Sequence, residues 1–168
     1  MNIPTFDDLV GRATDVATLL RGRGERVAVS ESAAGGLINA ALVAVPGASD
    51  MYLGGMVVYT AAGRHVLAGD DTLPEGLRGA TEEFARVQAG QAARRYRAEW
   101  GIGETGATGP KGNPYGDPAG HGWVACVSAT GAPTATRLLA TGSAVRADNM
   151  MVFAATALTL AAETIGAA

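Results

Sequence analysis

The stretch RVAVSESAAGGLINAALVAV, residues 26–45, decides how this chain folds. A run rich in β-branched residues ends in Ser30, Glu31 and Ser32, and Gly35 and Gly36 then precede an apolar helical pattern. The run predicts a buried strand, and the pattern predicts a helix directly after a glycine turn. Two hydroxyls, an acid and paired glycines therefore stand at a strand end, which is where open α/β sheets bind their ligands.

The turn between this strand and this helix has the character of an anion site. The helix would direct free N–H groups and the positive end of its dipole at a bound group. Gly35 and Gly36 have no Cβ, so a ligand could lie close to the backbone. We expect an anion here, with phosphate as the leading choice. Because a serine before a helix is also a common N-cap, the stretch alone leaves a structural role for Ser32 open.

Length and composition indicate one folded domain over residues 1–168. Of the 168 residues 48% are hydrophobic, and the net charge is −3, which argues against a disordered chain and against a nucleic-acid partner. Cys126 is the single cysteine, so an internal disulfide is excluded and a reducing compartment fits. The N-terminus does not resemble a signal peptide, and no apolar run is long enough to span a membrane. We therefore expect a cytoplasmic protein with no membrane partner.

Helical patterns and short apolar strands alternate along the chain. The predicted helices cover residues 5–24, 34–45, 61–69, 74–101 (with Pro74 in the first turn) and 145–166. The predicted strands cover 26–30, 51–60, 102–110, 123–129 and 135–143, the last two forming a hairpin around residues 130–133. Residues 111–122 are expected to form a loop. This order predicts an α/β fold: a three-layer α/β/α domain with a mixed, mostly parallel sheet and one antiparallel element.

Three motifs in this order carry a resemblance to a known family. They are SESAAGG at 30–36, GGMVVYTAAGR at 54–64 and TGATGPKGN at 105–113, with VPGAS at 45–49 between the first two. The chain resembles the CinA C-terminal domain family over residues 10–165. Characterised members are amidases that convert nicotinamide mononucleotide (NMN) to nicotinic acid mononucleotide and ammonia. The resemblance implies a single α/β/α domain, often a homodimer, with a small-molecule nucleotide as substrate.

The resemblance also implies roles for individual positions. Ser32 matches the family's serine nucleophile, and Tyr59 matches a tyrosine at the site. Thr105 and Gly106 match a hydroxyl and a stretch of backbone that contact the substrate. Substrate-facing glycines are implied at Gly35, Gly36, Gly54 and Gly55.

The chain departs from the family pattern where the catalytic base is expected. The family's lysine is replaced by Arg64, which stays protonated and cannot accept the serine proton. A carboxylate, Glu104, stands where the family usually has an apolar residue. It could form an ion pair with Arg64 in the site, or it could end a strand and face water. The remaining candidates for the base are the acids Glu31 and Glu104 and the histidines His65 and His121. Glu31 could instead orient the helix or accept a hydrogen bond from Tyr59.

Two further segments bear on ligand binding. The loop GNPYGDPAGHG, with Asp117 and His121, could form a lid over the ligand or an ordinary surface loop. Arg146 is a candidate phosphate contact, displaced from the family's arginine pattern. No metal-ligand spacing and no P-loop occurs, so neither a metal nor another cofactor is expected. Two functions stay open: an NMN amidohydrolase or a hydrolase of a related substrate, and a nucleotide-binding module that has lost turnover.

Overall fold

A five-stranded mixed sheet forms the centre of the protein, in the order β2-β1-β3-β4-β5. The computed structural model describes residues 2–69, 74–130 and 132–168. The strands are β1 Val27–Glu31, β2 Tyr52–Val57, β3 Trp100–Ala107, β4 His121–Ser128 and β5 Thr134–Ala140. β1 pairs in parallel with β2 and β3, whereas β4 runs antiparallel to both of its neighbours. The predicted sheet, mostly parallel with one antiparallel element, is therefore confirmed.

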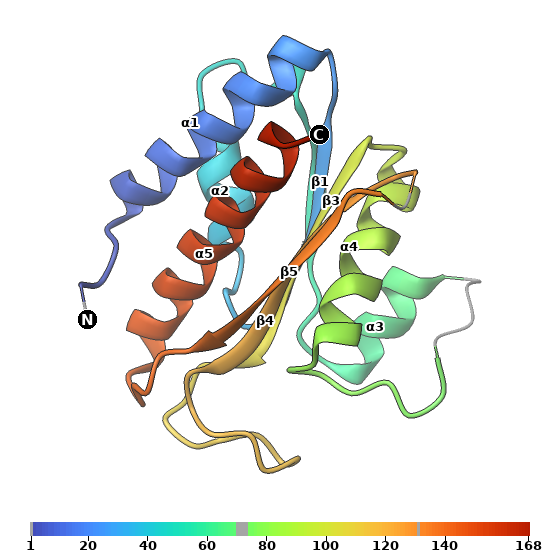
Figure 1. Ribbon diagram of the computed structural model, residues 1–168. Helices are drawn as coiled ribbons and strands as arrows, with labels where there is room; N and C mark the ends of the chain where they lie inside the picture. Colours follow the sequence, from blue (N-terminus) through green and yellow to red (C-terminus); the bar gives the residue numbers. More distant parts are fainter. Residues whose placement is uncertain (1, 70–73, 131) are drawn as a thin grey trace.

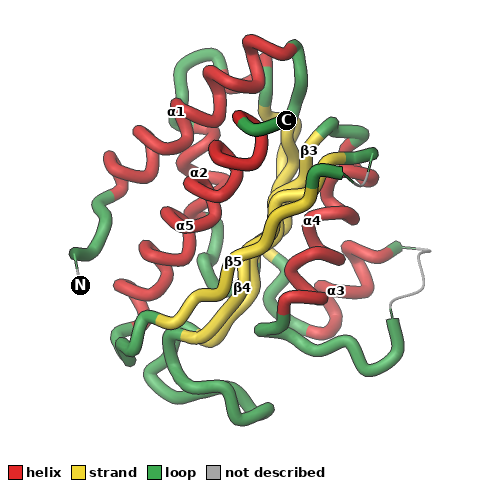
Figure 2. Tube along the Cα trace, viewed as in Figure 1, coloured by secondary structure: helices red, strands yellow, loops and turns green. Residues whose placement is uncertain are grey.

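Helices cover both faces of this sheet (Figures 1 and 2). On one face lie α1 Phe6–Arg23, α2 Leu37–Val43 and α5 Arg146–Gly166, and on the other lie α3 Ala61–Ala68 and α4 Glu82–Tyr96. A short 3-10 helix, Ala48–Asp50, leads from α2 into β2. The three-layer α/β/α arrangement follows the sequence prediction.

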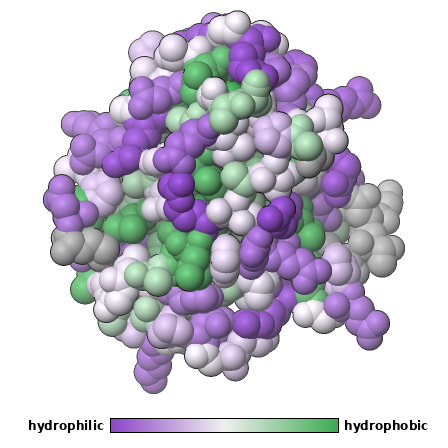
Figure 3. All heavy atoms as spheres, viewed as in Figure 1, coloured by the Kyte–Doolittle hydropathy of each residue, from purple (hydrophilic) through white to green (hydrophobic). Residues whose placement is uncertain are grey.

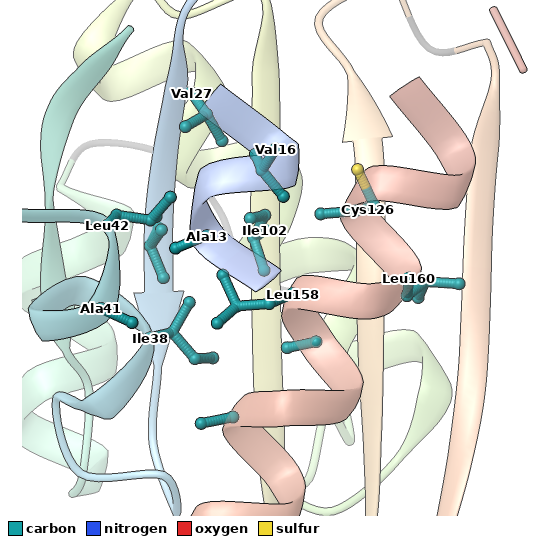
Figure 4. Packing of buried hydrophobic residues seen from close by; sticks show 14 of the residues in the cluster. Ala13, Val16, Val27, Ile38, Ala41, Leu42, Ile102, Cys126, Leu158 and Leu160 are labelled. Atoms are coloured by element: carbon teal, nitrogen blue, oxygen red, sulfur yellow. The ribbon is translucent and has the colours of Figure 1, made fainter. Parts of the chain in front are cut away.

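The first helix shows how local signals set an element's ends. Thr5 and Asp8 form a capping box at the start of α1, and Gly24 adopts a left-handed conformation at its end. The residues Leu9, Ala13, Val16, Ala17 and Leu20 recur at helical spacing and are fully buried. They pack against α2 and α5 in the core drawn in Figure 4.

The fourth helix begins later than predicted. Pro74 does not lie in its first turn, because α4 begins at Glu82 with Thr81 as N-cap. Gly76 and Ala80 have φ values of +73° and +59°, which an α-helix does not allow. The Thr81 hydroxyl accepts the Phe84 N–H and so starts the helix after this turn. The predicted hairpin turn at 130–133 includes residue 131, which lies outside the described residues.

The last helix is a core helix. α5 is long and apolar enough, by length and composition alone, to cross a membrane. In the fold it packs on α1, β4 and β5, and Phe153 and Leu158 are fully buried. Its apolar character is therefore accounted for by packing inside this domain. Figure 3 shows one face of the resulting surface, where polar side chains surround scattered apolar patches.

Candidate functional site

The carboxyl ends of β1, β2 and β3 meet at the lower end of the sheet as drawn in Figure 1. The connection from β1 to β2 passes through α2 on one face, and the connection from β2 to β3 passes through α3 and α4 on the other. The chain thus leaves the sheet in opposite directions around β1. Such a switch point opens a crevice beyond the strand ends.

A cavity of about 250 Å³ lies at this switch point and contains five of the predicted site residues. Ser32 follows β1, Tyr59 follows β2, Arg64 lies on α3, and Thr105 and Gly106 lie on β3. The lining is completed by Gly79, Ala80, Asn113 and Tyr115. The sequence motifs therefore converge in space, as their resemblance implied.

A second cavity, of about 240 Å³, adjoins the first and shares Tyr59, Gly106 and Asn113 with it. Arg146 and Lys111 line this part. The Arg146 guanidinium donates to the Thr108 hydroxyl at 2.9 Å and lies 3.4 Å from the Tyr59 hydroxyl. We call the two cavities together the Ser32–Arg146 cleft. The structure thus brings Arg146 to the same site as Ser32.

The Ser32 hydroxyl is half-buried in the first cavity and makes no hydrogen bond within the described part of the chain. Its neighbour across the cavity, Arg64, is also half-buried and stacks its guanidinium on the Phe84 ring, 4.5 Å from the ring centroid. Stacking of this kind fixes the plane of the guanidinium without using its N–H donors. A free hydroxyl and an oriented cation therefore share one cavity.

Both predicted alternatives for Glu104 are wrong, because its side chain neither pairs with Arg64 nor faces water. Glu104 lies on β3 with its side chain fully buried, and its Oε2 accepts the N–H groups of Ser32 and Ala34 at 3.0 and 2.9 Å. Among residues 2–69, 74–130 and 132–168, no carboxylate pairs with Arg64. Alternation along β3 explains this, because Thr105 faces the cavity and its neighbour Glu104 faces the opposite side of the sheet.

Burial keeps Glu104 protonated. Desolvation raises the pKa of this carboxyl to about 8, and the nearby Glu31 adds to the shift, while the N–H groups of Ala34 and Ser32 oppose it. The second oxygen, Oε1, has no hydrogen-bond partner in the described structure. At neutral pH the group is therefore mostly a neutral acid beneath the Ser32 turn.

Glu31 lies in the interior beneath the first turn of α2 and does not line the cleft. Its carboxyl is fully buried and accepts the N–H groups of Ile38 and Asn39 at 3.2 and 2.9 Å, together with the Asn39 side-chain amide. It thus caps the first turn of α2. Desolvation raises its pKa, against the lowering effect of these hydrogen bonds. Of the two alternatives for Glu31, orientation of the helix agrees with this geometry.

The two buried carboxyls also alter the expected anion site. The N–H groups of Ser32, Ala34, Ile38 and Asn39 point at Glu104 and Glu31, so they are not offered to a ligand. The protein's own acids occupy the positions where the sequence predicted a phosphate. The cations that could hold a phosphate, Arg146 and Lys111, lie instead at the second cavity.

The four glycines of the first two motifs serve the backbone and its packing. Gly35 and Gly36 have φ values of +67° and +101° and make the turn into α2. A Cβ on Gly54 would lie 2.7 Å from the Tyr96 ring, and one on Gly55 would overlap Asn39. None of the four is among the described residues that line the cleft, so their predicted contact with substrate is not supported.

The 111–122 loop forms one wall of the cleft. The loop lines the cleft with Asn113, Tyr115 and Lys111. Asp117 and His121 do not line the cleft but bind the segment that precedes α4. The Asp117 carboxylate accepts from Arg78 at 2.7 Å and from the Asn113 amide at 2.8 Å. The His121 ring is hydrogen-bonded to the Ala80 carbonyl at 3.1 Å. His121 is therefore not positioned as the base for Ser32, and His65 lies exposed on α3.

Several cleft residues were not anticipated from the sequence. Ala80 and Gly79, which line the cleft, and Phe84, which lies under Arg64, come from the segment predicted as the early part of a helix, and no role was predicted for Lys111. Their one sequence signal was the glycine-rich spacing at 76–79, which indicates a turn. In the described part of the chain, no three His, Cys, Asp or Glu side chains gather closely enough to hold a metal ion.

Comparison with known proteins gives a consistent result. The family model for the CinA C-terminal domain matches residues 11–165. A CinA-like protein of Prochlorococcus marinus is 41% identical over 109 residues, and one of an Anaeromyxobacter species is 39% identical over 124 residues. These matches cover 64% and 73% of this chain but 25% and 30% of the relatives, so the chain spans less than a third of their length.

Solved structures agree with the fold. The competence/damage inducible protein CihA of Agrobacterium tumefaciens superposes with a TM-score of 0.81 at 27% identity, covering 94% of each chain. A competence-damaged protein (CinA) superfamily protein of Enterobacter cloacae gives 0.84 at 23% identity, covering 94% of this chain and 92% of the other.

Proposed function

The chain belongs to the CinA C-terminal domain family, and on that basis we propose that it binds a pyridine mononucleotide in the Ser32–Arg146 cleft and hydrolyses its carboxamide. The substrate is NMN, and the products are nicotinic acid mononucleotide and ammonia. The observation that carries the proposal is that one continuous cleft holds an unbonded serine hydroxyl, an oriented guanidinium and a second cationic end.

The phosphate of the substrate binds at the second cavity. Arg146 and Lys111 supply positive charge there, and Thr108 holds the Arg146 guanidinium in place. Tyr59 lines both cavities, which positions its ring beside the middle of the ligand. The carboxamide then reaches the first cavity, where Ser32 and Arg64 lie.

Hydrolysis proceeds through an acyl-enzyme. The Ser32 oxygen attacks the amide carbon, and the carbonyl oxygen becomes an oxyanion that the Arg64 guanidinium stabilises. The C–N bond then breaks, and the nitrogen leaves as ammonia with the proton from the serine hydroxyl. Water then attacks the resulting ester, and one of its protons goes to the Ser32 oxygen as the ester bond breaks. The acid product gives its remaining proton to ammonia, which leaves carboxylate and ammonium.

No described residue is placed as a dedicated acceptor for the serine proton. In the described structure, no carboxylate, imidazole or amine contacts the Ser32 hydroxyl, and Arg64 stays protonated. The proton therefore passes to water in the cleft, and turnover is slow and increases with hydroxide concentration. The same observation favours a second candidate function, a mononucleotide-binding module without turnover.

The proposal includes the setting of the protein. It places the chain in the cytoplasm, as a homodimer that acts on a small-molecule nucleotide. The family resemblance and the single buried cysteine, Cys126, support this setting.

Ammonia release from NMN tests the function. We expect slow release by the wild-type chain, loss of release in Ser32→Ala, and release about 10²-fold faster in Arg64→Lys, because lysine can act as a general base. The rate of the wild type is expected to rise steadily between pH 6 and 9.

The controls separate the candidates. Release that persists in Ser32→Ala contradicts a serine nucleophile. Binding of NMN without release by the wild type, together with release by Arg64→Lys, supports the binding module. A wild-type chain that neither binds nor hydrolyses NMN contradicts both functions.

A further inference from the structure

The described residues that line the Ser32–Arg146 cleft include three cations and no acid. Arg64 lies in the first cavity, and Lys111 and Arg146 line the second. This concentration of positive charge occurs in a chain whose net charge is −3. Such a cleft attracts a ligand with negative charge at both ends, because positive charges gathered in a groove raise the local concentration of anions.

In the first cavity of the cleft, the residues around Arg64 leave its guanidinium available to a ligand. Phe84 supports one face of the guanidinium plane, and no described carboxylate neutralises it. Gly79 leaves room for it, because a Cβ on that residue would lie 3.0 Å from an Arg64 terminal nitrogen. A planar guanidinium with its N–H donors unused matches the two oxygens of a carboxylate.

The other side chains at this end also favour an acceptor-only ligand group. The Thr105 hydroxyl accepts the Ala80 N–H at 3.0 Å, which leaves its own O–H free to donate. The Asn113 carbonyl accepts the N–H groups of Tyr115 and Asp117, so it is already engaged within its loop. Ser32 adds another unbonded O–H.

A carboxylate and a carboxamide differ in what they need from such a pocket. A carboxylate only accepts hydrogen bonds, so it satisfies Arg64, Thr105 and Ser32 together. A carboxamide offers Arg64 one oxygen instead of two, and its NH₂ group brings two further donors next to the guanidinium. No acidic side chain among the described lining residues accepts from that NH₂ group, and the hydroxyls there are weaker acceptors than a carboxylate, so the carboxamide binds less tightly.

We propose that the Ser32–Arg146 cleft is selective for a ligand with a phosphate at one end and a carboxylate at the other. The carboxylate mononucleotide binds more tightly than its carboxamide counterpart, with Arg64 as the residue that distinguishes them. This inference rests on the proposed function for the phosphate end, but it needs no turnover. For the enzyme it means that the product of hydrolysis is retained and inhibits the reaction.

Calorimetric titration with a matched pair of ligands tests the proposal. Nicotinic acid mononucleotide and NMN share the sugar, the phosphate and the pyridinium ring, so the ratio of their Kd values isolates the carboxylate. Both are titrated into a Ser32→Ala chain, which does not consume NMN. We expect the carboxylate ligand to bind at least about tenfold more tightly.

Two variants in the same background identify the residue responsible. Arg64→Gln is expected to reduce the ratio of Kd values to within about threefold, because it removes the bidentate cation. Arg146→Gln is expected to weaken both ligands by a similar factor and to leave the ratio unchanged, because both carry the phosphate.

Each outcome has a distinct meaning. Equal affinities, tighter binding of NMN, or a ratio that survives Arg64→Gln overturns the inference. If neither ligand binds, the inference and the phosphate end of the proposed function are both overturned. If the carboxylate ligand binds at least about tenfold more tightly and the wild type releases no ammonia, the inference is upheld and only the proposed hydrolysis is rejected.

Discussion

At the residue scale, Glu104 connects the core to the Ser32 turn. One oxygen of its buried carboxyl receives the N–H groups of Ser32 and Ala34, and the other has no partner in the described structure. Because this acid keeps its proton, it carries no charge, and the free-energy cost of burying a charge does not arise. Glu104 is thus a positioning residue for the turn that carries Ser32.

The raised pKa of Glu104 predicts how stability depends on pH. Because the folded pKa of about 8 lies above the ordinary glutamate pKa of 4.5, the folded state binds a proton that the unfolded state releases. The contribution of Glu104 is complete below the unfolded pKa and is lost as the pH rises through the folded pKa. We expect the wild type to lose roughly 4 kcal/mol relative to Glu104→Gln between pH 5 and 9.

Urea unfolding of both proteins at pH 5, 7 and 9 measures this loss. Glu104→Gln is a suitable reference, because its amide oxygen can accept the same two N–H groups without titrating. Burial raises the pKa of Glu31, which is present in both proteins, so only the part of its titration that is coupled to Glu104 contributes to the difference. A difference in unfolding free energy that stays constant with pH would show that Glu104 does not hold a proton in the folded state.

At the element scale, the close contact between α4 and β3 positions the floor of the cleft. Gly101 and Gly103 face α4, and a Cβ on Gly103 would lie 2.1 Å from the Ala85 carbonyl oxygen. The absence of side chains lets the helix backbone approach the strand. This approach sets the position of Phe84, which supports Arg64.

The substitution Gly103→Ala is therefore expected to lower the free energy of unfolding by about 3 kcal/mol or more, because α4 must move away from the sheet. Gly11→Ala is the matched control. No atom lies within 4 Å of a Cβ at that position in α1, and alanine favours the helix by about 1 kcal/mol. Urea unfolding checks both. A loss below 1 kcal/mol in Gly103→Ala would contradict the close packing.

The sequence predicts elements well where local signals agree with the tertiary structure. Thr5 and Gly24 mark the ends of α1, and the β-branched run marks β1. The start of α4 was misplaced because Pro74 resembles a first-turn proline, whereas the positive φ of Ala80 is imposed by its contacts with Thr105 and His121. Such contacts between distant segments leave no mark in the local sequence.

At the scale of the whole molecule, the sheet topology brings the motifs to one end. The convergence of Ser32, Tyr59, Arg64 and Thr105 could be predicted from the parallel strands and the family motifs. The direction in which each side chain points could not be predicted from the sequence. An ion pair between Glu104 and Arg64 was one predicted alternative, but the alternation of β3 sends Glu104 to the other face of the sheet.

The same topology gives the cleft its charge. The acids near the site, Glu31 and Glu104, are turned inward to hold the backbone between β1 and α2, and the cations line the opening. The backbone amides at which the sequence predicted an anion site are thereby already occupied, and the positive groups of the cleft are side chains. This division between inner acids and outer cations explains why an acidic chain can offer a basic cleft.

A crystal structure of the Ser32→Ala chain with nicotinic acid mononucleotide tests the central claim most directly. We predict that the phosphate lies within hydrogen-bond distance of Arg146 and Lys111, with the carboxylate on the Arg64 guanidinium. A ligand bound with its phosphate on the backbone amides of residues 32–36, or outside the cleft altogether, would contradict the account.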